Sequence, residues 1–229
     1  MRLDDVCIVN SDVTASDDFY RLDVGLERRM RNVRFADFVF DSGPRLAMWL
    51  RPSIAETVGD AYPTAAGLPF RVRIELRDAP DGERLATDPD GYVTELVAAS
   101  GGVSRLSEVE LAVSDVESTA DFLARLGFER TVPGGSRFDG DGVTIILTPV
   151  ASLTESPRAE SFSRNGGHVM LAVELDSGAR VDELYDELRS RGLEASGPPA
   201  VYEWGARSTY FVDPDGYIWE IYAWVETPR

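Results

Sequence analysis

The chain has 229 residues, of which 43% are hydrophobic and 28% are charged, which suits one large or two small globular domains that each bury a core. Its formal net charge is −17 and all 23 basic residues are arginine, so phosphate backbones and anionic lipids are repelled, and we expect neither nucleic acid nor a membrane as a partner. The sequence shows no secretory leader and no membrane-length apolar run, and its single cysteine, Cys7, cannot form an internal disulfide, so we expect a soluble, cytoplasmic protein.

Two motifs in the first part of the chain return later. Ser11-Asp12-Val13, followed by Asp18-Phe19, recurs as Ser114-Asp115-Val116 with Asp121-Phe122, a separation of 103 residues. Residues 87–95, which contain Asp-Pro-Asp-Gly-Tyr, recur as residues 212–220, a separation of 125 residues. This self-similarity predicts two copies of one domain, residues 1–99 and 103–229, with Ala99-Ser100-Gly101-Gly102 as the linker.

The first copy is predicted to be degenerate. Its strand at Phe70–Leu76 is followed by the Asp-Pro-Asp-Gly motif at Asp88 after 12 residues, whereas the second copy needs 38 residues from Leu175 to Asp213. We therefore expect the first copy to have lost the helix of its second unit and to serve as a scaffold.

In the second copy, two alternating strands each lead into a helix. Residues 109–113 and 169–173 match at a separation of 60 residues. Helices are predicted at 116–126 and 179–191, because glycine, the usual residue after a helix C-terminus, follows each. Three short strands follow each helix, near 129–132, 136–139 and 143–148, and then near 194–195, 206–212 and 217–225. The second copy is thus predicted to contain two βαβββ units.

Alternation along these strands sorts the polar side chains onto faces. Glu108 and Glu110 are predicted to point away from the helix-covered core, as are His168, Met170, Glu220 and Tyr222. If the two units of this copy pair with each other, Glu108, His168 and Glu220 converge on one concave surface. The counterpart of Glu220 in the first unit is then Ile146, and Tyr210 faces Glu220 from the adjoining strand. Tyr202, Trp204 and Tyr222 are expected to add an aromatic lining to this pocket.

The duplicated βαβββ pattern and three motifs resemble the vicinal oxygen chelate superfamily. The motifs are Val-x-Leu-x-Val-Ser-Asp at 109–115, Gly-His-Val-x-Leu-x-Val at 167–173 and Asp-Pro-Asp-Gly-Tyr-x-x-Glu at 213–220. The group includes glyoxalase I, methylmalonyl-CoA epimerase, extradiol dioxygenases, fosfomycin resistance enzymes and bleomycin-binding proteins. The resemblance covers residues 103–226 well and residues 3–98 more loosely. It implies an α+β fold of tandem domains, each made of paired βαβββ units, and leaves the reaction open because one fold hosts many functions.

The resemblance also implies positions for a metal ion, on the first and fourth strands of each unit. In the second copy these positions are Glu108, Ile146, His168 and Glu220, of which three can bind a divalent ion such as Fe, Mn, Ni or Zn. In the first copy they are Asp5, Trp49, Pro69 and Glu95, which make a poor metal site. A structural role for His168, or a metal-free polar pocket for a cationic ligand, fits the same residues.

Three functions remain open from the sequence. The first is a metal-dependent lyase or isomerase of the glyoxalase or epimerase type, acting on a small molecule with vicinal oxygens, in which Glu108 or Glu220 moves the proton. The second is an extradiol-type dioxygenase, in which Tyr210 would assist; a single histidine disfavours it. The third is a metal-free binding or resistance protein for an antibiotic-type small molecule. Each implies a small-molecule ligand and a monomer or homodimer.

Overall fold

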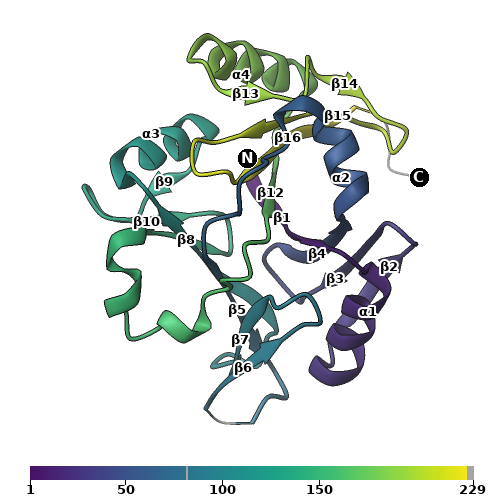
Figure 1. Ribbon diagram of the computed structural model, residues 1–229, viewed down its shortest axis with the longest axis vertical. Coiled ribbons are helices and arrows are strands. Elements are labelled where there is room, and N and C mark those ends of the chain that lie inside the picture. Colours follow the sequence, from purple (N-terminus) through teal and green to yellow (C-terminus); the bar gives the residue numbers. More distant parts are fainter. Residues whose placement is uncertain (81, 226–229) are drawn as a thin grey trace.

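Two β-sheets, A and B, form the centre of the computed structural model, which describes residues 1–80 and 82–225 (Figure 1). Sheet A runs in the order β13 (Glu194–Ala195), β15 (Ala206–Val212), β16 (Ile218–Trp224), β12 (Val169–Glu174), β1 (Arg2–Asn10), β4 (Arg45–Leu50), β3 (Phe35–Val39) and β2 (Glu27–Arg31), with β14 (Ala200–Val201) paired to β15. Sheet B runs in the order β6 (Glu83–Thr87), β7 (Val93–Ala98), β5 (Phe70–Leu76), β8 (Arg105–Val113), β11 (Thr144–Pro149), β10 (Arg137–Asp139) and β9 (Glu129–Arg130).

Each sheet combines one unit from each half of the chain, and the first-half unit of sheet B consists of the strands β5, β6 and β7. In sheet A, β1 pairs antiparallel with β12, and Cys7 lies opposite Met170. In sheet B, β5 pairs antiparallel with β8, and Val72 lies opposite Val109. The two units of the second half therefore belong to different sheets, and the prediction that they pair with each other was wrong. The division at residues 99–103 still separates the two copies of the sequence repeat. It does not separate the sheets, because each sheet contains strands from both copies.

The two helices predicted in the second copy, at 116–126 and 179–191, are present as α3 (Val116–Leu126) and α4 (Gly178–Ser190). Asp12 and Asp115, which are equivalent in the repeat, both cap a helix by accepting hydrogen bonds from backbone N–H groups two and three residues later. In the described residues between Leu76 and Glu83 there is no helix, which confirms the predicted loss. The helical segments are α1 (Val13–Asp18), η1 (Phe19–Val24), α2 (Arg51–Val58), η2 (Gly59–Ala61), α3 (Val116–Leu126), η3 (Val150–Glu155), η4 (Ala159–Ser161) and α4 (Gly178–Ser190).

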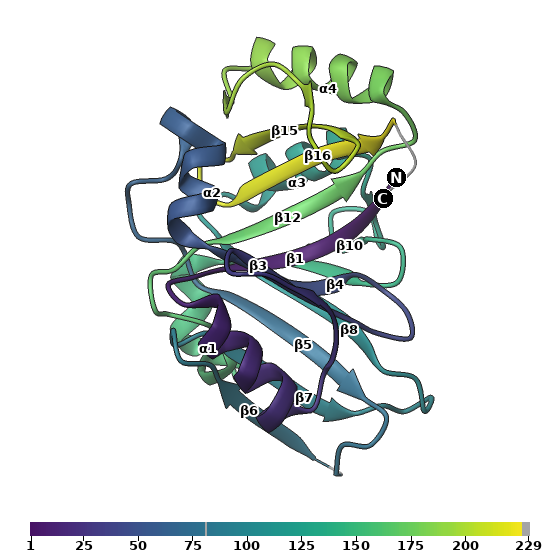
Figure 2. The same ribbon diagram turned by 90° about the vertical axis from the view of Figure 1, so that its right-hand side faces the viewer.

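One hydrophobic core joins the two sheets through the helices. Leu171 and Trp219 of sheet A belong to the same buried cluster as Leu111 of sheet B, together with Leu123 of α3 and Leu184 of α4. Figure 2 shows α4 lying over β15 and β16. Full burial of one such leucine contributes about 1.5–3 kcal/mol, so this cluster is the main stabilising feature. Its position leaves the opposite face of each sheet free to carry polar side chains. Among the described residues, no helix has the length and apolar character that crossing a membrane requires.

The cap at the start of α3 gives a test of the fold. We expect Asp115→Ala to lower the free energy of unfolding by about 1 kcal/mol, because two backbone N–H groups lose their acceptor. Asp115→Asn should cost much less, since the amide oxygen can still accept. Asp121→Ala, on the exposed side of the same helix, is the control. Equal losses in urea unfolding for Asp115→Ala and Asp121→Ala would contradict the capping role.

Candidate functional site

The structure separates the three residues that were predicted to converge. Glu108 lies on β8 in sheet B, whereas His168 immediately precedes β12 and Glu220 lies on β16, both in sheet A. Glu110 and Ile146, expected to line the same pocket, are also in sheet B. The prediction of convergence was wrong because the two units of the second half pair with partners from the first half.

Asp5 takes the place expected for Glu108. It lies opposite Ala172 of β12, which in turn lies opposite Glu220 of β16. Two strand spacings separate the Cα atoms of Asp5 and Glu220, roughly 10 Å. His168 lies just before the start of β12, and its carbonyl oxygen accepts a hydrogen bond from the backbone N–H of Val9 on β1. Asp5 and Glu108 are equivalent in the 103-residue repeat, so the site has the expected kind of residue from the other half of the chain.

The register also corrects the counterpart of Glu220. Ile146 lies opposite Glu110, and Thr148 lies opposite Ala112, just as Glu220 lies opposite Ala172. Thr148 is therefore the equivalent residue, two positions beyond the one predicted. In the first unit the equivalent is Trp49, which lies opposite Val9, as the resemblance had implied. The four family positions on sheet A are thus Asp5, Trp49, His168 and Glu220.

In sheet B, a buried arginine fills the space between the polar side chains. Arg71 is fully buried and forms ion pairs with Glu95, Glu108 and Glu110. Burial alone would raise the pKa of Glu108, but the hydrogen bond and charge of Arg71, with those of Arg137, hold that pKa below its usual range. All three carboxylates are thus paired with arginine. Glu108 is therefore poorly placed to act as a base.

Beside Glu108 there is a cavity of about 350 Å³ on the same face of sheet B. Glu75 and Arg105 line it and form an ion pair with each other, with N–O distances of 3.0 Å. Its other walls include Thr131, Asp139 and Thr144. A cavity with so little apolar lining, in which Glu75, Arg105 and Glu108 are already paired, offers an organic ligand little binding energy.

Glu220 is held differently from the carboxylates of sheet B. Its Oε1 atom accepts hydrogen bonds from Ser208 Oγ at 2.6 Å and from Tyr210 Oη at 3.0 Å. Among the described residues, no arginine forms an ion pair with it. Burial raises the pKa of Glu220, and the two hydroxyl hydrogen bonds oppose that rise. The predicted contact between Tyr210 and Glu220 is present, and both are buried.

Asp5 is also a buried acid with an elevated pKa. Its Oδ2 atom accepts a hydrogen bond from Arg45 at 2.5 Å, while Oδ1 is buried and has no hydrogen-bond partner among the described residues. Burial raises the pKa of Asp5 to about 8; Arg45 opposes the rise, and the nearby Asp4, Asp37 and Glu220 add to it. Arg45 is shared with Asp4 and Asp37, and each of these two acids has a further arginine partner, Arg2 for Asp4 and Arg29 for Asp37.

His168 is a neutral imidazole packed against an aromatic ring. Burial, with the charge of Arg51, lowers its pKa. The edge of Tyr62 contacts it at a centroid distance of 5.5 Å. The Nδ1 atom is buried without a hydrogen-bond partner in the described part of the chain. A Cβ atom at Gly67 would lie 3.1 Å from Nδ1, so the loop before β5 covers this nitrogen.

Aromatic side chains surround the two acids. Tyr210 contacts Trp49 and Tyr202 edge to face, each at 6.2 Å between centroids. Tyr202 stacks on Trp204 at 4.6 Å, and Trp204 remains 39% exposed. Tyr222 packs in the same cluster as Met170 and Tyr210. We call this surface of sheet A, which carries Asp5, His168, Tyr210 and Glu220, the site face.

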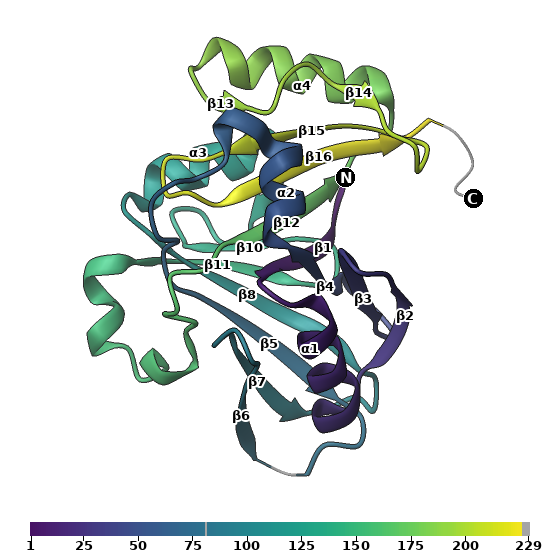
Figure 3. The ribbon, with the colours of Figure 1, turned by 45° about the vertical axis from the view of Figure 1, so that its right-hand side comes forward.

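Helix α2 covers one end of the site face and was not predicted. Ile54 and Val58 pack in one cluster with Cys7, Met170 and Ile218 of the sheet. Figure 3 shows α2 in front of β12. A local signal for the helix is Pro52 in its first turn, where proline is favoured.

Comparison with known proteins gives the family. A model of the Glyoxalase/Bleomycin resistance protein/Dioxygenase superfamily matches residues 105–221, slightly more than half of the chain. The chain belongs to this superfamily. The predicted resemblance is thereby confirmed, as is the α+β class of tandem glyoxalase-type domains.

Solved structures of this superfamily share the fold at low sequence identity. Glyoxalase I from Zea mays aligns with a TM-score of 0.56 and 17% identity over 97% of this chain and 92% of that chain. A proposed dioxygenase from Bacillus subtilis aligns with a TM-score of 0.59 and 14% identity over 99% and 86%. Comparison with curated proteins gives no match.

The donor atoms on the site face are not arranged to bind the metal ion of the superfamily. Trp49 contributes no ligand atom, Asp5 Oδ2 is bound by Arg45, and Glu220 Oε1 is bound by two hydroxyls. Within residues 1–80 and 82–225, no group of three or more His, Cys, Asp or Glu side chains is arranged to hold a metal ion. The predicted ligand set of Glu108, His168 and Glu220 is divided between two sheets.

The role of Arg71 can be tested by removing its charge. We expect Arg71→Ala to lower the free energy of unfolding at pH 7 by about 3–5 kcal/mol, because three carboxylates lose their buried counter-ion. The loss should shrink as the pH falls toward about 4, since protonated carboxyls need no counter-ion. Urea unfolding at several pH values measures this. The control is Arg137→Gln, a half-exposed partner of Glu108, for which we expect about 1 kcal/mol or less. A pH-independent loss would contradict the electrostatic explanation.

Proposed function

We propose that the chain binds a small organic cation with a flat apolar body on the site face of sheet A, without a resident metal ion. The observation that carries this proposal is Glu220, a buried carboxylate whose partners are two hydroxyls and no arginine. A buried carboxylate without a counter-charge is costly, so a ligand cation that supplies the charge gains binding energy. The name of the superfamily, which includes bleomycin resistance proteins, is consistent with such a binding role.

The surroundings of Glu220 support the same ligand class. Trp49, Tyr202 and Trp204 offer π-faces, which attract cations and stack on flat rings. Asp5 adds a second acid on the face, and its Oδ1 atom is buried without a hydrogen-bond partner among the described residues. The net charge of −17 attracts cations over longer distances.

Proton transfer on the bound molecule is a second candidate function. The raised pKa of Glu220 and the contact of its Oε1 with Tyr210 Oη are features that suit a general acid or base. This keeps the lyase or isomerase prediction in a form that requires neither Glu108 nor a metal ion. Glu220→Gln would abolish such turnover even where it leaves ligand uptake measurable.

Binding can be tested with a pair of probes of matched shape. We expect 1-methylquinolinium to bind and 1-methylnaphthalene, its neutral isostere, to bind at least tenfold more weakly in calorimetric titration. Glu220→Gln should remove most of this preference, because it keeps the size of the side chain and removes the charge. Tyr210→Phe should weaken binding less. The control is Glu194→Gln on the exposed edge strand β13. Equal binding of both probes to the parent protein would refute the proposal.

The affinity should also depend on pH. Because the pKa of Asp5 is raised to about 8, this acid is protonated in the free protein near pH 6 and must lose its proton to face a cation. Affinity should therefore rise by up to about tenfold per pH unit between pH 6 and 8 and level off above that. Calorimetry in buffers of different ionisation enthalpy measures the released proton. Asp5→Asn should flatten the profile, and an unchanged profile in that variant would assign the dependence to another group.

A further inference from the structure

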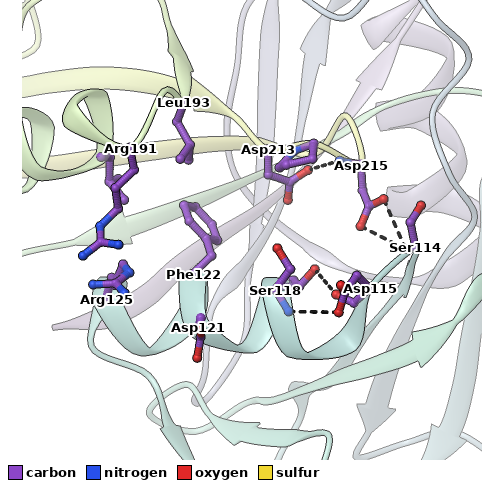
Figure 4. Close-up of a pocket in the computed structure, with 13 residues that line it drawn as sticks. Ser114, Asp115, Ser118, Asp121, Phe122, Arg125, Arg191, Leu193, Asp213 and Asp215 are labelled. Atoms are coloured by element: carbon purple, nitrogen blue, oxygen red, sulfur yellow. Dashed lines mark hydrogen bonds between the residues drawn. The ribbon is translucent and has the colours of Figure 1, made fainter.

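A second cavity lies on the helix side of sheet A, away from the site face. It has a volume of about 250 Å³, roughly eight times the ~30 Å³ that one water molecule takes up in the liquid. Its walls are α3, the C-terminal end of α4 and the turn between β15 and β16 (Figure 4). This volume suits a small metabolite of about ten non-hydrogen atoms.

Two arginine side chains lie at one end of the cavity. Arg125 of α3 and Arg191, which follows α4, lie next to each other there (Figure 4). Both are paired with the same carboxylate: Glu187 Oε1 is 2.9 Å from Arg125 and 3.7 Å from Arg191. Asp121 also lines the cavity, but within the described residues it forms no ion pair with either arginine. Arginine pairs of this kind bind a carboxylate well, because the donors are planar and always charged.

The other end carries acids and a hydroxyl. Asp115 and Ser118 lie there beside the turn that contains Asp213 and Asp215 (Figure 4). Asp213 and Asp215 are committed to backbone N–H groups of the fold. Asp115 uses only Oδ1 to cap α3, so its second oxygen can accept a hydrogen bond from a ligand. An ammonium group is the complementary partner for this end.

Between the two ends, the floor of the cavity is apolar. Phe122 and Leu188 are almost fully buried, and Phe122 rests on Trp219 at 5.3 Å between centroids. Ser118 and Arg125 are seven residues apart on α3, so their Cα atoms are separated by about 10.5 Å at 1.5 Å per residue. A ligand that satisfies both ends therefore needs its charges separated by a chain of several methylene groups.

The repeat distinguishes structural residues from residues that define the cavity. Asp12 and Asp90 of the first copy make the same capping and turn contacts as Asp115 and Asp215, so these acids serve the fold in both copies. The position equivalent to Arg125 is Leu22, which is 64% exposed. In the first copy, the described residues between Leu76 and Glu83 also contain no helix equivalent to α4. The arginine end and its apolar floor are thus features of the second copy that the repeated fold does not require.

We propose that this cavity binds a small linear zwitterion, an ω-amino carboxylic acid, with its carboxylate on Arg125 and Arg191 and its ammonium group facing Asp115. A zwitterion has no net charge, so the net charge of −17 does not repel it as it repels a simple anion. The methylene chain covers Phe122 and Leu188, which contributes apolar burial in addition to the two charged contacts.

The test uses 6-aminohexanoate and three relatives in calorimetric titration of the full chain. Hexanoate lacks the ammonium group, hexylamine lacks the carboxylate, and 2-aminohexanoate has the same atoms with adjacent charges. We expect 6-aminohexanoate to bind at least tenfold more tightly than each of the three. Arg125→Gln and Arg191→Gln should each weaken its binding about tenfold, whereas Arg180→Gln, at the other end of α4, should not change it.

Several outcomes would overturn the proposal. These are equal affinity for 6-aminohexanoate and 2-aminohexanoate, binding of hexanoate as tight as that of the zwitterion, or no heat of binding at millimolar 6-aminohexanoate. Because the side chains of Arg125 and Arg191 are 32% and 47% exposed, the variants should remain folded, and thermal unfolding of each verifies this. Tight binding that survives both arginine variants would place the ligand elsewhere.

Discussion

Antiparallel pairing between the two halves of the chain is the constraint on which the rest of the structure depends. β1 lies on β12 and β5 lies on β8, so neither half forms a sheet by itself. Because side chains alternate along a strand, partner and register together decide which side chains share a face. In this pairing Asp5 and Glu220 lie on either side of Ala172, and Glu108 forms an ion pair with Arg71. A different exchange of units would produce different sites from the same residues.

Local features of the fold could be predicted from the sequence because they depend on short-range chemistry. Gly127 after α3 is the usual residue at a helix C-terminus and ends the helix as predicted. The lost helix after β5 followed from a difference in chain length between equivalent motifs. The contact of Tyr210 with Glu220 followed from parity on two strands joined by a hairpin, where a tight turn leaves little freedom of register.

The partners of the strands could not be predicted in the same way. Periodicity says which face a residue lies on and does not say which strand lies beside it. Asp5 and Glu108 are equivalent in the repeat. The strand of either residue could therefore pair with the strand that follows His168 without changing the alternation of side chains. The counterpart of Glu220 was misplaced by two residues, from Thr148 to Ile146, because a shift of two preserves parity. Helix α2 was missed because its apolar side is narrow: of its eight residues only Ile54 and Val58 are buried.

The two sheets use equivalent positions to reach opposite electrostatic solutions. At the centre of sheet A, Cys7 lies opposite Met170, and at the equivalent centre of sheet B, Glu110 lies opposite Arg71. The guanidinium of Arg71 neutralises Glu95, the repeat equivalent of Glu220. The buried acid of sheet B therefore needs no cation from a ligand. In sheet A the central pair carries no charge, and Glu220 has only hydroxyl partners. A buried acid that the chain itself does not neutralise is stable only with a raised pKa or with a cation from a ligand. This difference between Glu220 and Glu95 is why we place ligand binding on sheet A.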